Sequence, residues 1–231
     1  MILLDMLNSC SFGKYIDRMQ LSINNRVAKI TYVSSSDTLL GTIVSNELLP
    51  DIQLNIEIPA VQDFIKILKV VGKEYTMTME DDSTICVKND HQEIKYGIAS
   101  GYNIRKIPTI KSSVISPLSS IKIDLSSQQL KHIVNMHGVN KHCKHVIIHS
   151  DEFGLVIEFT QGRDRENRSI ITFPRIENPV ESTIVMDSEM FSMVVSKNIK
   201  AVSSTLTVYS GFMCNFDFRY NDFIHSINII S

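Results

Sequence analysis

The stretch that decides the fold is residues 62–73, which read QDFIKILKVVGK. A helix turns by about 100° per residue, so this stretch would gather its apolar residues on one side. The apolar side is expected to hold Val61, Phe64, Leu68 and Val71. The opposite side is a stripe about 60° wide that holds only cations, Lys66, Lys69 and Lys73. Pro59 suits a first turn and Gly72 an end, which predicts a helix over 59–71.

Composition indicates a folded protein. The chain has 231 residues, of which 43% are hydrophobic and 21% are charged, and it has no tryptophan. This length fits one large domain or two ordinary ones. The net charge of −2 argues against a protein that binds nucleic acid through its overall charge. The net charge does not exclude a local basic surface whose charge is balanced by acids elsewhere in the chain.

The termini and the cysteines indicate an intracellular protein. No apolar run has the length of a membrane span, and the N-terminus, MILLDMLNSC, has no basic leader. We therefore expect neither a membrane helix nor a signal peptide. The cysteines lack paired spacing, which favours reduced thiols; they are Cys10, Cys86, Cys143 and Cys214.

Period-2 alternation predicts strands along most of the chain. In the first half, we expect them in the region of residues 19–23 and 52–58 and at 26–33, 39–45, 75–80, 83–89 and 93–100. Residues 105–120 lack a sustained period and contain Pro108 and Pro117, which predicts a connector. In the second half, we expect strands at 120–125, 145–152, 154–160, 168–173, 182–187, 204–210, 213–220 and 223–231, and helices at 126–137 and 188–200.

The two halves repeat one plan of helix, several strands, helix and three strands. Thr76 matches Thr205 and Thr78 matches Thr207 when YTMTMED is set against STLTVYS. Such self-similarity indicates a duplicated α+β domain, each copy an antiparallel sheet with two helices on one face. We expect an N-terminal domain at 1–104, a connector at 105–119 and a C-terminal domain at 120–231.

Catalytic motifs are missing from the sequence. It has no phosphate-binding glycine loop, GxSxG or HExxH pattern. Acid pairs such as Asp81-Asp82 lie in predicted hairpin tips, where acids are common. The cluster of His137, His142, Cys143 and His145 could be a metal site, but its spacing fits no standard zinc pattern and a polar loop explains it. We predict no enzyme, no metal and no cofactor.

The whole chain resembles the two-domain sliding clamps, the DNA polymerase processivity factors that include proliferating cell nuclear antigen and the clamps of T4-like phages. The resemblance rests on the element order, the connector, the length and the segments IPAVQDFIKIL and IDLSSQQLKHIV. One departure is that MILLDML enters a helix almost at once, where the family usually starts with a strand.

The resemblance implies a homotrimeric ring around duplex DNA, with helices inside, sheets outside and no catalytic activity. The DNA would be bound without regard to sequence. A DNA polymerase would ride on the ring, and an ATP-dependent clamp loader would open it. The ring would work in the cytoplasm of a bacterial host if the source is a phage, or in a nucleus. The expected DNA-facing residues are Lys66, Lys69, Lys73, Lys131, Lys141, Lys144, Lys197 and Lys200.

Two further sites follow from the resemblance. A hydrophobic pocket for partner peptides would use Tyr32, Leu39, Ile115, Leu118, Met213, Ile227 and Ile229, although most of these could instead be core residues. The subunit interface would pair the strand around 93–99 with that around 168–173 of the next copy. Its residues would be Glu93, Ile94, Lys95, Tyr96, Ile98, Arg168, Ile170, Ile171 and Phe173.

Two rival functions remain open at this point. The first is a monomeric processivity factor of the same fold, which would bind DNA through one basic face. The second is a β-rich structural or assembly protein, such as a virion component, which would have no lysine-lined channel. The mass in solution separates a ring from a monomer.

Overall fold

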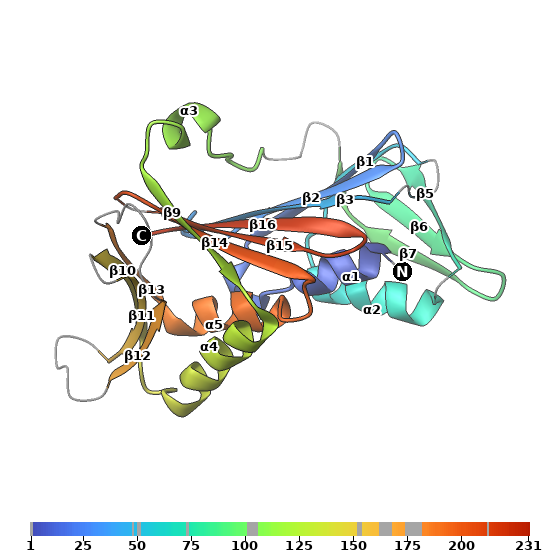
Figure 1. The fold of residues 1–231 in the computed structure, drawn as a ribbon. Helices are drawn as coiled ribbons and strands as arrows, with labels where there is room; N and C mark the ends of the chain where they lie inside the picture. The colour runs from blue at the N-terminus through green and yellow to red at the C-terminus, as the bar shows by residue number, and fades with distance from the viewer. Residues whose placement is uncertain are drawn as a thin grey trace. The chain divides into compact units, whose positions relative to one another are not determined.

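The computed structural model describes residues 2–47, 49, 52–72, 74–100, 106–151, 154–161, 168–173, 182–211 and 213–231. The chain forms two compact units (Figure 1). Unit 1 is Met1–Pro108 with Asn221–His225, and unit 2 is Thr109–Tyr220 with Ser226–Ser231. The expected division into domains at residues 104 and 120 stays a prediction.

Unit 1 contains two main helices among its strands. In chain order its elements are α1 (Ile2–Ser9), the 3-10 turn η1 (Gly13–Tyr15), β1 (Arg18–Asn24), β2 (Val27–Val33), β3 (Leu39–Ser45), β4 (Leu54–Glu57), α2 (Val61–Val71), β5 (Thr76–Asp81), β6 (Thr84–Lys88), β7 (Glu93–Gly97) and β8 (Ala99–Ser100).

The strands of unit 1 form two antiparallel groups, ordered β8-β4-β1-β2-β3 and β5-β6-β7. Helix α1 packs on β2 and β3, α2 packs on β6 and β7, and the two helices contact each other (Figure 1). Alternate residues of β1 are buried, among them Leu21 and Ile23, because successive side chains of a strand point to opposite faces. The buried face of this sheet and the helices enclose the core.

A buried polar pair lies in the core of unit 1. The Tyr32 hydroxyl and His225 Nε2 are 2.6 Å apart, and both side chains are fully buried. The Phe12 ring stacks on His225 with centroids 6.2 Å apart and meets Tyr32 edge-on. Burial lowers the pKa of His225 to about 3. The imidazole is therefore neutral, and its Nε2 can accept a hydrogen bond from the Tyr32 hydroxyl.

Unit 2 repeats the plan with one additional strand at its start. Its elements are α3 (Ser112–Ile115), β9 (Ser120–Leu125), α4 (Ser127–Val139), β10 (His145–Asp151), β11 (Gly154–Thr160), β12 (Arg168–Phe173), β13 (Ser182–Asp187), α5 (Ser188–Lys197), β14 (Ser203–Tyr209), β15 (Met213–Arg219) and β16 (Phe223–Ile230), whose first residues belong to unit 1.

The strands of unit 2 are ordered β12-β11-β10-β13 and β16-β15-β14-β9. Helices α4 and α5 lie side by side, and α5 packs on β10 and β13 (Figure 1). Four buried aromatic rings run through the core in sequence, with neighbouring centroids 5.6–6.2 Å apart; they are Phe159, Phe191, Phe216 and Phe218. Packing of this kind makes the helix-facing side of unit 2 strongly apolar.

The structure confirms the α+β class and the repeated helix–sheet plan. The order β3-β2-β1-β4 in unit 1 matches β12-β11-β10-β13 in unit 2, and β7-β6-β5 matches β16-β15-β14. The chain also enters helix α1 at Ile2, as its first residues predict. The duplication is therefore a property of the topology as well as of the sequence.

Three local predictions were wrong. Helix α2 begins at Val61, after Ala60 as N-cap, so Pro59 lies outside its first turn. The expected strand at 93–100 is two strands, because β8 leaves β7 at Ile98 and pairs with β4 instead. The connector contains the single helical turn α3 between Pro108 and Pro117, although its prolines had argued against helix.

Candidate nucleic-acid interface

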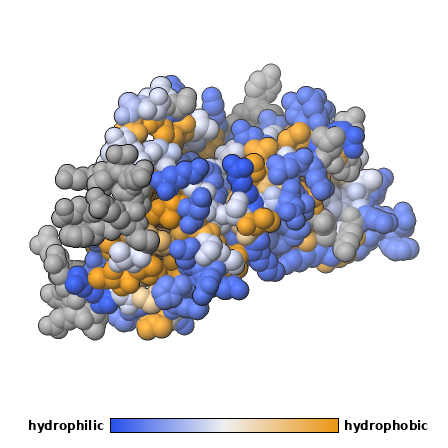
Figure 2. Space-filling view, in the orientation of Figure 1, coloured by the Kyte–Doolittle hydropathy of each residue, from blue (hydrophilic) through white to orange (hydrophobic). Residues whose placement is uncertain are grey.

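Helix α2 carries the cationic stripe of unit 1. Its buried residues are Phe64, Ile65, Leu68 and Val71, and Val61 is half-buried. Lys66 and Lys69 are exposed on the other side of the helix, and Lys73 lies outside the described residues. Figure 2 shows mostly hydrophilic side chains over the region where Figure 1 places α2. The helix therefore presents ammonium groups to solvent while its apolar side holds it to the sheet.

One acid lies beside this stripe and was missed from the sequence. Asp63 accepts a hydrogen bond of 2.8 Å from Lys66 Nζ, with the two side chains 60% and 73% exposed. Exposed pairs of this kind contribute little to stability and are screened by salt. The i,i+3 spacing of the two residues could have indicated the pair. Lys66 is thus available to another anion at small cost.

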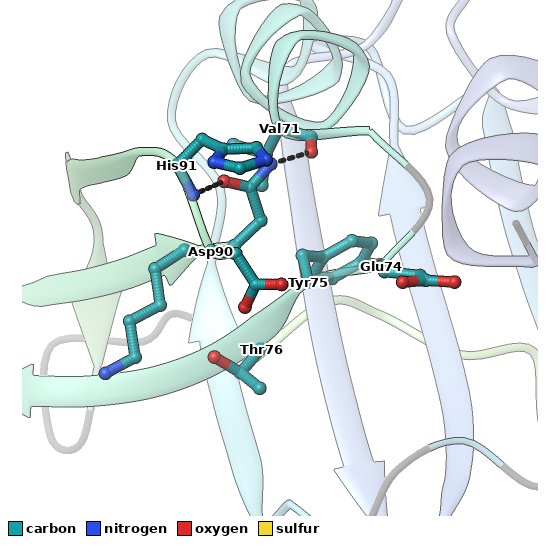
Figure 3. Close-up of a pocket in the computed structure, with 8 residues that line it drawn as sticks. Val71, Glu74, Tyr75, Thr76, Asp90 and His91 are labelled. Carbon is teal, nitrogen blue, oxygen red and sulfur yellow. Dashed lines mark hydrogen bonds between the residues drawn. The ribbon is translucent and has the colours of Figure 1, made fainter.

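The C-terminal end of α2 is held by the β6–β7 turn. Asn89 Nδ2 donates to the Val71 carbonyl at 2.6 Å, and Gln92 Nε2 donates to that of Val70 at 2.7 Å. Gly72 adopts a positive φ of 91°, which suits glycine after a helix. Beside this end lies a hollow of about 840 Å³, in which Figure 3 places Tyr75 between Glu74 and Asp90.

Helix α4 carries the first lysine of unit 2. Its N-terminus has a capping box, in which Ser126 Oγ accepts from the Gln129 N–H and the Gln129 side chain accepts from the Ser126 N–H. Leu130 and Ile133 are buried, and Lys131 is exposed. The sequence therefore fixes both where α4 starts and which side of it faces solvent.

Helix α5 carries the remaining helical cation of unit 2. Asp187 caps its N-terminus by accepting from the Met190 N–H at 2.7 Å. Lys197 in its last turn and Lys200 just beyond are exposed. Lysines at a helix C-terminus are favoured by the helix dipole, so this placement also has a purely structural benefit.

The turn between α4 and β10 adds Lys141 and Lys144, both exposed. They line a hollow of about 800 Å³ together with His137, Asp187 and Glu189. Burial lowers the pKa of His137, while Glu189 and Asp187 oppose that shift. The structure places Cys143 in the interior, and no group of three or more potential ligands for a metal occurs among the described residues.

The residues expected for a peptide pocket divide by burial. Tyr32 and Leu39 in unit 1 are fully buried, as are Met213, Ile227 and Ile229 in unit 2, with exposures of 0–1%. Ile115 and Leu118, on and just after α3, are half-buried. The pocket stays a prediction, and Ile115 and Leu118 are the two members accessible in the isolated chain.

The expected interface strands both lie at sheet edges. Among the described strands, β7 pairs only with β6, and β12 pairs only with β11. On β7, Lys95 forms an ion pair with Glu80 and Tyr96 donates to the Ala60 carbonyl at 2.9 Å; Glu93 is exposed and Ile94 half-buried. Ile98, just past β7, is almost buried at 9% exposure.

On β12, alternate residues face solvent. Arg168 and Ile170 are exposed, Ile171 is half-buried and Phe173 is buried. Arg168 lies 3.9 Å from Glu158 on the neighbouring strand. An exposed isoleucine on an open edge leaves backbone groups and apolar surface available for pairing.

Within the part of the chain that the structure describes, every helix falls short of the length and apolar character needed to cross a membrane. Neither a protein-family model nor a curated protein matches the chain by sequence.

Several solved structures of proliferating cell nuclear antigen, PCNA, are similar to this chain. The A. fulgidus PCNA bound to the C-terminal region of FEN-1 is 14% identical, with a TM-score of 0.70, over 99% of this chain and 94% of that one. The PCNA2–PCNA3 complex of Sulfolobus tokodaii gives 13% identity and a TM-score of 0.72, again over 99% and 94%.

Entamoeba histolytica PCNA gives 12% identity and a TM-score of 0.69 over 99% of this chain and 94% of that one. The similarity extends over both units and their topology, although the sequences have diverged. The chain has the fold of the PCNA sliding clamps.

Proposed function

We propose that this protein is a sliding clamp that encircles duplex DNA as a ring and tethers a DNA polymerase. The observation that carries the proposal is that both units of a clamp-like fold expose lysines from their helices. Lys66 and Lys69 lie on α2, Lys131 on α4 and Lys197 on α5, all exposed. Because both copies of the domain expose lysines on their helices, they fit a function in which both copies contact the same DNA.

Lysine suits contact with DNA that must not stop at any sequence. Its compact charge interacts with phosphates and releases counterions, but it does not impose the fixed bidentate geometry by which arginine reads guanine. The proposed DNA-facing set keeps Lys73, Lys141, Lys144 and Lys200 with the four helical residues. The nearby carboxylate of Asp63 partly offsets the positive charge of Lys66, but the stripe as a whole keeps a positive net charge.

Ring closure would use the open edges of β7 and β12. A head-to-tail interface between unlike edges produces a closed ring when the rotation per subunit fits, and three copies would give six similar domains. The Sulfolobus neighbour is a complex of two PCNA chains, which supports self-association. Proline at Ile170 or Ile171 should lower the sedimentation coefficient of the assembly, because it removes a backbone donor at the edge.

Partner binding is the third part of the proposal. The A. fulgidus neighbour holds the C-terminal region of FEN-1, which supports enzyme partners that bind through short segments. Here the partners would be a polymerase and an ATP-dependent loader, without a catalytic role for the clamp itself. Leu118, half-buried beyond α3, is the accessible residue to test, because replacing a fully buried one such as Met213 would disturb the core.

The decisive experiment replaces Lys66, Lys69 and Lys73 with alanine and measures binding to two unrelated 30-base-pair duplexes across a salt series. A matched control replaces three exposed lysines on strands, Lys29, Lys88 and Lys122. The first variant should bind both duplexes more weakly, with a slope of log K against log salt that is shallower by about 0.9 per lost phosphate contact. The control should keep the wild-type slope.

Sedimentation of the same proteins completes the test. A trimer that keeps its mass in the lysine variant supports the ring. A monomer at high concentration that still binds DNA would favour the monomeric processivity factor instead. A wild-type protein with no affinity for either duplex would overturn the proposal and leave the structural or assembly role. A lysine variant that binds both duplexes with the affinity and the slope of the wild type would also overturn it.

A further inference from the structure

The two units differ at one sheet edge. In unit 2 the order is β16-β15-β14-β9, and in unit 1 the matching order is β7-β6-β5. Strand β9 precedes α4 and covers the outer edge of β14. Among the described strands, none takes the corresponding place beside β5. Within the part of the chain that the structure describes, the outer edge of β5 is therefore unpaired, whereas that of β14 is paired with β9.

Strand β9 shows what such an edge accepts. It runs antiparallel to β14, with Ile121 opposite Val208 and Ile123 opposite Leu206. Both β14 residues are fully buried. On the other face, Thr205 Oγ1 donates to Asp124 Oδ1 at 3.0 Å. The added strand thus completes an apolar row on one face and a polar pair on the other.

Strand β5 keeps the matching residues uncovered. The alignment of the two repeats sets Met77 against Leu206 and Met79 against Val208. Met79 is 37% exposed and Met77 half-buried, whereas their β14 counterparts have 0% exposure. Thr76 and Thr78, which correspond to Thr205 and Thr207, are also exposed. A strand bound to this edge would bury Met77 and Met79 on one face. On the opposite face, its side chains would lie beside the hydroxyls of Thr76 and Thr78.

The two ends of β5 set the length and polarity of the docked strand. A bulge between Met79 and Asp81 breaks the regular ladder with β6, so pairing is limited to Thr76–Met79. Glu80 in the bulge and Asp81 just after it are exposed. At the other end, Tyr75 and Thr76 border the hollow beside the end of α2 (Figure 3).

We infer that the open edge of β5 is a docking site for an extended segment of a partner protein, bound antiparallel as β9 is bound to β14. The segment has apolar residues at alternate positions, facing Met77 and Met79, and basic residues at its N-terminal end, facing the acids at the bulge. Main-chain hydrogen bonds supply affinity, and the alternate side chains supply selectivity.

Charge disfavours a second copy of this chain as the occupant. In the antiparallel register that brings two methionine rows together, the acids at the bulge of one copy, Glu80 and Asp81, would lie near Glu74 of the other, and like charges close together are destabilising. A basic segment has the opposite preference. The inference does not depend on DNA binding, so it can stand or fall separately from the clamp function.

The experiment uses a fluorescent peptide, KKSIKIDL, in which residues 120–125 of this chain follow two added lysines. Its binding to the full chain is followed by fluorescence anisotropy. Met79→Lys should weaken binding at least tenfold, while Met79→Leu should leave it unchanged. The matched control is Val44→Lys on β3, because Val44 has the same 37% exposure. A peptide with both isoleucines replaced by asparagine should bind at least tenfold more weakly.

Hydrogen exchange supplies a second readout. Alternate amides of β5 should exchange faster than those of β14 in the free protein and become protected when the peptide binds. Equal peptide binding by Met79→Lys and wild type, or no binding at all, overturns the docking site. Slow exchange along all of β5 in the free protein overturns the open edge. A concentration-dependent dimer that Met79→Lys abolishes makes a second copy the occupant, which also overturns the inference.

Discussion

Two aromatic side chains occupy matching positions in the two units and are accommodated in different ways. Tyr32 on β2 lies opposite Gly41, and Phe159 on β11 lies opposite Ser169. Both rings are fully buried. A Cβ at Gly41 would lie 1.9 Å from the Tyr32 ring, so the glycine makes room for the ring. The Tyr32 ring, which is larger by its hydroxyl group, thus requires a residue without a side chain opposite it.

The surroundings of the two rings differ as well. The Tyr32 hydroxyl forms a hydrogen bond with His225. Phe159 packs on Phe191 and His137, and it has no polar group that needs a hydrogen-bond partner. One topology thus accommodates two kinds of core, one in which the buried Tyr32 hydroxyl has His225 as its partner and one in which the Phe159 ring needs none.

The largest expected effect comes from making unit 1 resemble unit 2 at this position. Gly41→Ser should lower the free energy of unfolding by about 3 kcal/mol, because the added atoms overlap the Tyr32 ring. The reverse change, Ser169→Gly, should lower it by about 1 kcal/mol, mainly through loss of the hydrogen bond from Asn140. Urea denaturation of both variants measures the asymmetry.

A second substitution controls for the cause. Tyr32→Leu combined with Gly41→Ser should be more stable than the sum of the single effects predicts, since the shorter side chain removes the overlap. Strict additivity would mean that the strain lies elsewhere than between these two residues.

The second prediction concerns acid. Burial holds the folded pKa of His225 near 3, below the ordinary 6.5, so the folded state favours the neutral imidazole. Its contribution to stability is complete above pH 6.5 and declines as the pH falls from there toward 3, by up to about 1.4 kcal/mol per pH unit. His225→Gln, which cannot titrate, should have a shallower decline between pH 6 and pH 4 in denaturant titrations.

Phe216 offers the control for the acid response. Phe216→Leu should destabilise the protein by a similar amount at every pH, because its buried ring packs on Phe191 and Phe218 and the change removes apolar contacts and no ionisable group. If its acid slope changed as much as that of His225→Gln, the polar pair would not be the source.

The smallest expected effects come from the helix starts. Asp187 caps α5, but the matching helix α2 has Ala60 at its N-cap position and therefore lacks a side-chain cap. Asp187→Ala should cost about 1 kcal/mol, and Ala60→Ser should add about 0.5 kcal/mol. Thermal unfolding of the two variants measures both. A loss of stability in Ala60→Ser would indicate that the hydrogen bonds between Ala60 and Tyr96 had been disturbed instead.

Much of the fold could be predicted from the sequence because its signals are local. The strands at 39–45, 154–160, 168–173 and 182–187 were predicted with the bounds that the structure has. The strands at 168–173 and 182–187 alternate between more exposed and more buried residues, which reports one buried face, whereas 154–160 is a short, mostly apolar run that is buried almost throughout. The lysine stripe of α2 was likewise visible, because side-chain direction in a helix follows from spacing alone.

The remaining features depend on partners elsewhere in the chain. Strand β8 separates from β7 because β4 offers it a partner about 43 residues earlier. Tyr32 was expected in a peptide pocket, and its polar partner His225 lies 193 residues away. No window of sequence contains both members of such a pair, so only the folded chain could bring them together.

By itself, the sequence determined the duplicated plan, the class of each main element and the lysine-rich sides of the helices. These follow from periodicity, which is set by the geometry of neighbouring residues. The tertiary structure decided which strand edges are paired and which are open, where each buried hydroxyl or imidazole finds its partner, and why Gly41 must be glycine. Those outcomes depend on contacts between residues distant in the chain, and their energies exist only once the core has formed.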